Sequence, residues 1–371
     1  MIFNSDILFT GYYGQQNTGD DAFVEVASWG ANKYWNKTNN RFLAKSENLP
    51  KTLFPVSGYP LTIPKTYSLQ ADCLLSNTQA FIYAGGSTIH SRLSPSNIRY
   101  KAVQRKKNGK DLKYGAIGVS IGPFKSIENE RAIQSYLKHM DFLAVRDQAS
   151  YDIVSEWDLP YNPINAFDLA ALLPEIYNYL FQKKNNQIKI IGISVCPYES
   201  HQVGMNSSME IKRNTMLIDL IKKLDKLGNF HFRFYVINGN PKYGDLKLTT
   251  ETVEKASPKN FEIFYYNKNT KLTWESIAQC DLVVSTRLHA AIFACFAEVP
   301  FMLNEYHRKC GDFLNNVGYN NMYRLFNSEF DVNKKAEQIV EIVNNPSIYS
   351  KPKHIKEMTE KARINFTAIN F

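Results

Sequence analysis

Hydrophobic positions along the chain fall into short apolar runs, each followed by a polar turn and then by a longer segment with helical spacing. The runs with the length and composition of buried strands are residues 7–10, 81–84, 114–120, 142–145, 188–194, 232–237, 261–265 and 282–284. Alternation of strands and helices is typical of parallel sheets that carry helices on both faces. We therefore predict an α/β fold built from Rossmann-like domains.

The polar segment 182–187 interrupts this alternation and has the composition of an exposed linker. It divides the chain into an N-terminal domain, residues 1–180, and a C-terminal domain, residues 188–345. We expect the two Rossmann-like domains to face a central cleft. The last segment, residues 346–371, is basic and has a helical pattern. It either packs back on the N-terminal domain, which we favour, or touches anionic lipid at a membrane surface.

The composition is that of a globular protein with sizeable cores, with 371 residues of which 44% are hydrophobic. The five cysteines lack C-x-x-C spacing, so neither a disulfide framework nor a metal site is expected. The net charge of +9 favours anionic partners, but no recognised nucleic-acid-binding motif is present. Because the sequence shows neither a basic leader nor an apolar run of about 20 residues, we expect a soluble, cytoplasmic protein. Peripheral contact with the inner face of the membrane stays open.

The stretch 281–300 changes from strand to helix within a polar triplet. Its first apolar residues form a short strand, and the alanine-rich run after His289 is typical of a packed helix that ends at Pro300. Arg287 and Leu288 therefore lie at the carboxyl end of a parallel strand, where ligands bind in open α/β sheets. Arginine offers a cationic fork and histidine a titratable proton, which suits an anionic substrate that must be protonated. A surface loop is the alternative interpretation.

A glycine-rich loop, residues 11–19, joins the first strand to the first helix. Its spacing matches neither G-x-G-x-x-G nor a P-loop, although its glycines permit tight turns and close approach of the backbone to a ligand. Asp20 and Asp21 follow directly. Either they cap the first helical turn, or one of them reaches into the cleft to bind or deprotonate a hydroxyl group.

Three other positions are candidates for ligand contacts. Arg146 stands just past a predicted strand, as Arg287 does, so we treat it as a second anion contact, with an Arg–Asp surface pair as the alternative. Gly86 belongs to a glycine pair after another strand, where a simple turn is favoured over a phosphate-binding loop. Lys309 is a further cation in the C-terminal domain, with a solvated side chain as the alternative.

Three segments combine these residues in a specific order along the chain. They are Gly11-Tyr12-Tyr13-Gly14 with Asn17 and Gly19-Asp20-Asp21, then Val145-Arg146-Asp147 with Ser150, then Ser285-Thr286-Arg287-Leu288-His289 followed by Val299-Pro300 and Tyr306-x-x-Lys309. In this order, and over nearly the whole chain, the sequence resembles the polysaccharide pyruvyl transferase family. The resemblance implies a fold similar to that of two-domain GT-B glycosyltransferases, and transfer of a pyruvyl ketal from phosphoenolpyruvate to a sugar.

The resemblance also implies roles for individual residues. The substrate-binding set would be Arg287, Arg146, Lys309, Leu288, Asn17 and Gly86, with His289 as the proton donor or a phosphate ligand and Asp20 or Asp21 acting on the acceptor hydroxyl. Phosphoenolpyruvate would be the donor substrate, bound on the C-terminal domain, the N-terminal domain would be the acceptor side, and no cofactor or metal is expected. The acceptor would be a sugar or a lipid-linked oligosaccharide used for a cell-surface polysaccharide.

Two other functions remain open from the sequence. A sugar-nucleotide-dependent glycosyltransferase would use the same cations on a diphosphate, and saturable binding of UDP or GDP would identify it. A non-catalytic glycan-binding protein would use some of the 22 tyrosines and 23 phenylalanines as a stacking surface, and would bind sugar without turnover.

Overall fold

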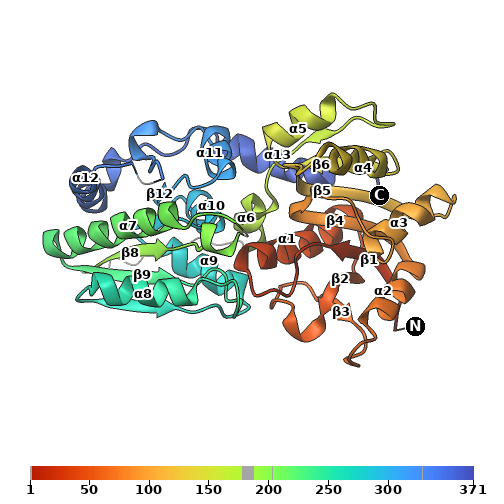
Figure 1. Cartoon of the computed structure of the whole chain (residues 1–371), viewed down its shortest axis with the longest axis horizontal. Helices are drawn as coiled ribbons and strands as arrows, with labels where there is room; N and C mark the ends of the chain where they lie inside the picture. The colour runs from red at the N-terminus through yellow and green to blue at the C-terminus, as the bar shows by residue number, and fades with distance from the viewer. Residues whose placement is uncertain (1, 178–187, 203, 328) are drawn as a thin grey trace. The chain divides into compact units, whose positions relative to one another are not determined.

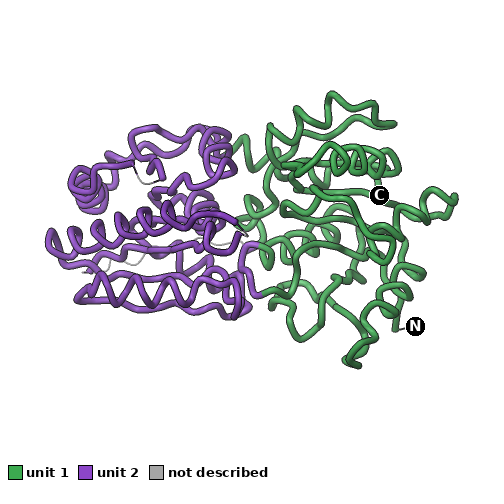
Figure 2. Tube along the Cα trace, in the orientation of Figure 1, with its two compact units in different colours: residues 1–15, 20–176, 356–371 green, residues 16–19, 177–355 purple. Residues whose placement is uncertain are grey.

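The chain forms two compact units in the computed structural model (Figure 2). The structure describes residues 2–177, 188–202, 204–327 and 329–371. Unit 1 consists of Met1–Gln15, Asp20–Ile176 and Lys356–Phe371, and unit 2 consists of Gln16–Gly19 and Tyr177–Ile355. The predicted linker, residues 182–187, lies outside the described residues.

The sheet of unit 1 is parallel throughout, with the strand order β3-β2-β1-β4-β5-β6-β7 (Figure 1). Its strands are β1 (Ser5–Thr10), β2 (Asn40–Lys45), β3 (Ser57–Tyr59), β4 (Thr78–Ile89), β5 (Lys113–Ile121), β6 (Phe142–Val145) and β7 (Ile164–Asn165). The direction of the strand order changes between β1 and β4. The carboxyl ends of these two strands are therefore the topological switch point, where open α/β sheets bind ligands.

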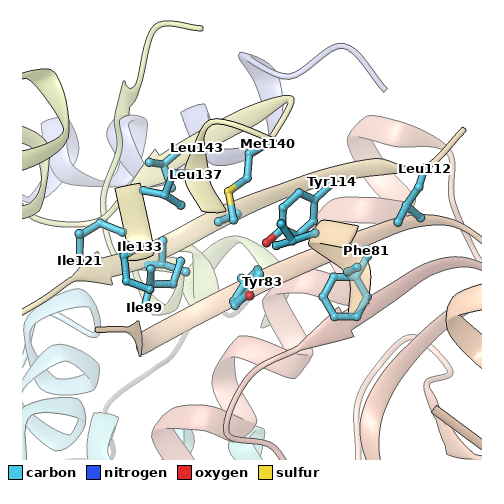
Figure 3. Close-up of a cluster of buried hydrophobic side chains, with 14 of the residues drawn as sticks. Phe81, Tyr83, Ile89, Leu112, Tyr114, Ile121, Ile133, Leu137, Met140 and Leu143 are labelled. Carbon is cyan, nitrogen blue, oxygen red and sulfur yellow. The ribbon is translucent and has the colours of Figure 1, made fainter. Parts of the chain in front are cut away.

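Helices connect the strands of unit 1 and bury its sheet. They are α1 (Thr18–Trp35), α2 (Tyr67–Ser76), α3 (Ile98–Lys107), α4 (Ile127–Leu137), α5 (Gln148–Ser155), α6 (Leu173–Tyr177) and α13 (Ile355–Thr367). Side chains of α2, α3, α4 and α5 share one hydrophobic cluster with β4 and β5. Figure 3 shows part of this cluster, in which Ile133 of α4 lies beside Ile89 of β4. This continuous core fixes the carboxyl ends of β4, β5 and β6.

The C-terminal helix α13 is part of unit 1. The Trp35 indole donates a hydrogen bond of 3.0 Å to the Phe366 carbonyl, and the Phe366 ring lies where a side chain at Gly30 would stand. The Asn365 side chain is fully buried and accepts a hydrogen bond of 2.7 Å from the Gly118 N–H. The last residues of the chain thus complete the core formed by its first half.

Unit 2 contains a second parallel sheet with the strand order β10-β9-β8-β11-β12. Its strands are β8 (Lys189–Ser194), β9 (Phe230–Tyr235), β10 (Phe261–Phe264), β11 (Leu282–Ser285) and β12 (Phe301–Leu303). The order repeats the pattern of unit 1, and the switch point lies between β8 and β11. The prediction of an α/β fold with two Rossmann-like parallel sheets is confirmed.

Helices cover both faces of the second sheet. They are α7 (Ser208–Leu227), α8 (Leu246–Ala256), α9 (Thr270–Ala278), α10 (Leu288–Phe296), α11 (Arg308–Asn316) and α12 (Val332–Asn344). Helix α7 packs against α8 and α12, whereas α10 packs against α9, β11 and β12. The apolar run after His289 is therefore a buried helix, as predicted. Among the described residues, no helix has the length and apolar character that a bilayer crossing requires.

Candidate functional site

The glycine-rich loop is divided between the units, because its second half, Gln16–Gly19, belongs to unit 2 and residues 11–15 belong to unit 1. The Gly239 N–H donates a hydrogen bond of 2.7 Å to the Gln16 carbonyl, and the Thr18 N–H donates one of 2.9 Å to the Ile237 carbonyl. These bonds hold the segment antiparallel to the chain just after β9. The start of α1 is thereby placed at the carboxyl edge of the second sheet.

Asn17 caps this start of α1. Its side-chain oxygen accepts a hydrogen bond of 3.0 Å from the Gly19 N–H, which is one of the N–H groups that a helix start leaves without a carbonyl partner. Asp20 and Asp21, which the sequence offered as caps, lie inside the first turn instead. Asn17 therefore has a local structural function in addition to its predicted place in the substrate site.

His289 is held against Gly19. It is the second residue of α10 and is half-buried. A Cβ atom built at Gly19 would lie 2.1 Å from Nδ1 of His289, far closer than two such atoms can approach. Only a glycine at position 19 leaves space for the imidazole in this position. Leu288, the first residue of α10, is buried and anchors the same turn.

Arg287 precedes α10 and forms an ion pair with Asp245, which is completely buried. Nε of Arg287 donates a hydrogen bond of 2.9 Å to Oδ1 of Asp245, and Nη2 binds the same oxygen. The other carboxylate oxygen accepts a hydrogen bond of 2.8 Å from the Asn238 N–H. Burial raises the pKa of Asp245, and Arg287 opposes this rise. Burial lowers the pKa of Arg287, but Asp245 outweighs this effect and raises it, so the guanidinium stays charged.

The strand ends at the switch point are joined by serine side chains. Ser194 and Ser285 are the last residues of β8 and β11 and pair in register, and their hydroxyl groups are 2.7 Å apart. Ser285 donates its proton to the Arg287 carbonyl at 2.6 Å, so Ser194 is the donor in the bond between the two hydroxyls. These bonds fix the turn that carries Arg287.

Lys309 brings a second cation to this part of unit 2. Its ammonium lies 5.9 Å from the centroid of the Tyr306 ring, and the Tyr306 hydroxyl accepts a hydrogen bond of 3.6 Å from the thiol of Cys196. Burial raises the pKa of Cys196, and the charges of Arg287 and Lys309 both oppose that rise. Both cations therefore act on the same buried thiol just past the end of β8, together with the carboxylate of Asp245, which raises the pKa of this thiol.

Arg146 lies in unit 1 and has a nearly complete set of partners. Its three donor groups bind Asp168 at 2.8 Å, the Ser120 hydroxyl at 2.8 Å and the Ser87 hydroxyl at 3.0 Å. Only 9% of the residue is exposed. Arg146 does pair with an aspartate, Asp168, but the alternative of a surface pair is wrong because both side chains are buried. A role for Arg146 in binding an anion stays a prediction.

Asp20, Asp21 and Gly86 also lie in unit 1. The favoured interpretation of a turn at Gly85 and Gly86 is wrong, because both glycines lie within β4, which continues to Ile89; their positive φ, of 75° and 81°, precedes a shift in the register with β5. A Cβ at Gly86 would lie 3.8 Å from Oδ1 of Asp20, so this carboxylate faces the glycine pair. Asp21 is buried, with 1% exposed. That Asp20 or Asp21 acts on an acceptor hydroxyl stays a prediction.

The structure thus sorts the predicted residues into two groups. Asn17, Arg287, Leu288, His289 and Lys309 lie in unit 2, and Asp20, Asp21, Gly86 and Arg146 lie in unit 1. The described residues contain no group of three or more histidine, cysteine, aspartate or glutamate side chains placed to hold a metal ion.

Sequence reasoning missed Asp245, Ser194 and Cys196. A signal existed for Asp245, because this residue follows a glycine in the loop after strand β9 and directly precedes α8. Nothing in the sequence indicated that its partner would be Arg287, 42 residues away. Ser194 and Cys196 become meaningful only through the pairing of β8 with β11.

Several solved structures have the same fold as the chain at low sequence identity. The UDP-GlcNAc 2-epimerase of Neisseria meningitidis bound to UDP-GlcNAc is 11% identical and has a TM-score of 0.58, with 98% of this chain and 99% of that chain covered. The HepE protein of Anabaena in complex with UDP and glucose is 12% identical, with a TM-score of 0.54 and 98% of each chain covered. A glycosyltransferase of Rickettsia africae is 11% identical, with a TM-score of 0.51 and coverage of 98% and 94%. The fold of the chain is therefore GT-B-like.

The sequence gives a more specific result than the fold. No curated protein has a significant match to the chain. Residues 17–308, however, match the polysaccharide pyruvyl transferase family, and this range includes Asn17, Arg146, Arg287 and His289. The matched range is most of the chain and, of the strands described, leaves out only β1. The chain therefore belongs to the polysaccharide pyruvyl transferase family.

Proposed function

We propose that the protein transfers a pyruvyl group from phosphoenolpyruvate to two hydroxyl groups of a sugar in a polysaccharide or its precursor, forming a ketal and releasing phosphate. The observation that carries the proposal is the turn after β11, where Arg287, held by Asp245, directly precedes α10, of which His289 is the second residue; Lys309 lies in the same unit. Phosphoenolpyruvate bears both a carboxylate and a phosphate. It needs more than one cation and a proton donor at one site.

Arg287 is prepared for this role by its ion pair. Because Asp245 binds Nε and Nη2, the guanidinium is fixed in orientation and keeps its charge although it is largely buried. The first N–H groups of a helix have no carbonyl partner within the helix, so the start of α10 adds partial positive charge to the site. Lys309 supplies a compact positive charge suited to phosphate.

The reaction then proceeds through proton transfer to carbon. His289 donates a proton to the methylene carbon of phosphoenolpyruvate, and the adjacent carbon becomes electrophilic. One sugar hydroxyl forms a C–O bond there, the C–O bond to phosphate breaks, and the second hydroxyl closes the ketal. Of the two hydroxyl protons released, one restores His289 and the other leaves with phosphate. Asp20 or Asp21 orients or deprotonates the acceptor. A positioned acid contributes about 10²–10⁴-fold to such a rate.

The test uses purified protein with phosphoenolpyruvate and a panel of simple hexosides, following phosphate release and the mass gain of the sugar. We expect His289→Gln to lower kcat by about 10²-fold or more. We expect Arg287→Lys to raise the KM for phosphoenolpyruvate at least about tenfold, because a lysine cannot reproduce the fork. The matched controls are His354→Gln and Arg324→Lys. Arg324 also pairs with a carboxylate, that of Glu305.

The alternative is a sugar-nucleotide-dependent glycosyltransferase. It is favoured by the fold, since solved proteins with this fold include a glycosyltransferase and a complex with UDP and glucose. Saturable UDP binding that is weakened by Arg287→Lys, together with no acceptor-dependent phosphate release from phosphoenolpyruvate, would replace the main proposal with this one.

A further inference from the structure

A cavity of about 580 Å³ opens in unit 2 between the loops that follow β8 and β9. One side is formed by Pro197, Ser200 and His201 together with Glu210 at the start of α7. The other side is formed by the loop from Gly239 to Gly244 and by the first turns of α8. Small-molecule sites typically have about 300–1,000 Å³, so the volume is sufficient for one or two sugar residues. No step of the proposed reaction uses this cavity.

Residues that line the cavity are neighbours in the sequence of the residues that surround Arg287. Gly244 and Leu246, which line it, flank the buried Asp245 that holds Arg287. On the other side, Pro197 directly follows Cys196, the thiol on which both cations act. A ligand in the cavity would therefore lie beside the proposed donor site and share its walls.

The charges of the lining are balanced. Two lysines, Lys242 and Lys247, stand against two carboxylates, Glu210 and Glu251, and His201 lies in the same lining. A site for a diphosphate would need an excess of cations. A lining with equal numbers of donors and carboxylate acceptors, interspersed with proline and leucine, instead matches a neutral molecule with many hydroxyl groups.

The walls on both sides of the cavity are held in place by hydrogen bonds. Glu210 accepts bonds from the N–H groups of Tyr198 and Ser200, at 2.8 and 3.1 Å, which shapes the loop after β8. Asn240 accepts bonds from the N–H groups of Lys242 and Tyr243, at 3.0 and 3.1 Å, which shapes the loop after β9. A site formed before ligand arrives loses less entropy on binding.

His201, which lines the cavity, forms an aromatic pair with Tyr243, a residue between the lining residues Lys242 and Gly244. The ring of His201 meets the ring of Tyr243 edge to face, with centroids 5.5 Å apart, and 44% of Tyr243 is exposed. The Lys242 ammonium lies over the Tyr243 ring, 4.9 Å from its centroid, so the apolar face of a pyranose would stack on the part of the ring that stays exposed, while the sugar hydroxyls meet polar groups. We propose that this cavity binds a neutral sugar residue of the acceptor glycan. That this sugar belongs to the acceptor glycan rests on the proposed function, whereas the binding of a neutral sugar by the cavity does not.

The experiment measures binding without turnover. Methyl glycosides of glucose, galactose, mannose and N-acetylglucosamine are tested at millimolar concentration against the full chain by saturation-transfer difference NMR. Glu251→Gln and Lys247→Met are expected to weaken binding about tenfold each, because each removes a hydrogen bond to a charged group. Leu248→Trp fills the cavity and is expected to abolish binding. Glu254→Gln and Lys255→Met, on the same helix but outside the cavity, should bind as the wild type does.

Each result decides the proposal. Absence of binding by every glycoside, or equal binding by the cavity variants and the wild type, would overturn it. UDP binding that is lost in the same variants would show that the cavity holds a nucleotide, and would overturn it as well. If sugar binding depends on the cavity but phosphoenolpyruvate is never consumed, the sugar site stands and the pyruvyl transfer fails. If pyruvyl transfer occurs and the cavity variants leave the KM for the acceptor unchanged, the pyruvyl transfer stands and the sugar site in the cavity fails.

Discussion

Replacing Gly19 by alanine is the most direct perturbation of the proposed proton donor, because it adds one methyl group beside the imidazole. The new Cβ would stand 2.1 Å from Nδ1 of His289. Non-bonded carbon atoms prefer separations of about 3.5–4.0 Å, so the ring or the start of α1 has to shift by on the order of 1 Å. A misplacement of that size can cost about 10²-fold in rate.

The same change has a small effect on stability. Alanine is better than glycine in a helix by about 1 kcal/mol, and overpacking costs about 1–3 kcal/mol, so the net loss should not exceed about 2 kcal/mol. The kinetic effect should therefore be larger than the effect on folding. Gly311→Ala in α11 is the matched control, since its new Cβ would meet only the ends of two flexible side chains, at 3.1 and 3.5 Å.

The assay compares acceptor-dependent phosphate release with urea unfolding for Gly19→Ala, His289→Ala and the double variant. We expect Gly19→Ala to lose activity while it stays folded, and the double variant to be no less stable than His289→Ala, because the clash is gone. Wild-type activity of Gly19→Ala would refute the reasoning, since the imidazole could then be displaced without consequence. A double variant less stable than His289→Ala by the full cost of the single change would refute the contact itself.

Three further substitutions test buried polar or titratable groups elsewhere in the protein. Asp245→Asn leaves the buried guanidinium of Arg287 without its counter-charge, so urea unfolding should show a loss of about 3 kcal/mol and the KM for phosphoenolpyruvate should rise. Burial, aided by two neighbouring cations, lowers the pKa of His307 to about 4, so the unfolded chain binds more protons below pH 6.5. The wild type should lose up to about 2 kcal/mol relative to His307→Asn as pH falls from about 6.5 to 4, and equal pH profiles would contradict this. Asn365→Ala removes the acceptor of the buried Gly118 N–H and should cost about 1–3 kcal/mol of stability, measured by thermal unfolding.

The elements with clear hydrophobic patterns could be predicted from the sequence. The strand predicted at 142–145 is β6 with the same bounds, and the strand predicted at 282–284 is β11 extended by one residue. Both strands are buried along their whole length, so their apolar runs are continuous. The helix after His289 was predictable for the same reason.

Short strands at or near the sheet edges escaped prediction. β3 has the sequence SGY and β7 the sequence IN, which are too short and too polar to stand out from a turn. β2, with the sequence NRFLAK, alternates polar and apolar residues over only 6 positions. These strands form because a neighbouring strand offers its backbone hydrogen bonds, and a local pattern cannot show that neighbour.

The candidate site shows the same division between local and long-range information. The sequence places Arg287 just past a strand, and parallel strands put their carboxyl ends at one edge, so its location at the edge of the sheet was predictable. What decides its environment is the register that sets Ser285 beside Ser194, and the loop that brings Asp245 to the guanidinium. Both partners are supplied by other strand ends of the same sheet. A single cationic residue in a strand-to-helix turn therefore predicts that a site exists, while the order of the strands determines which residues complete it.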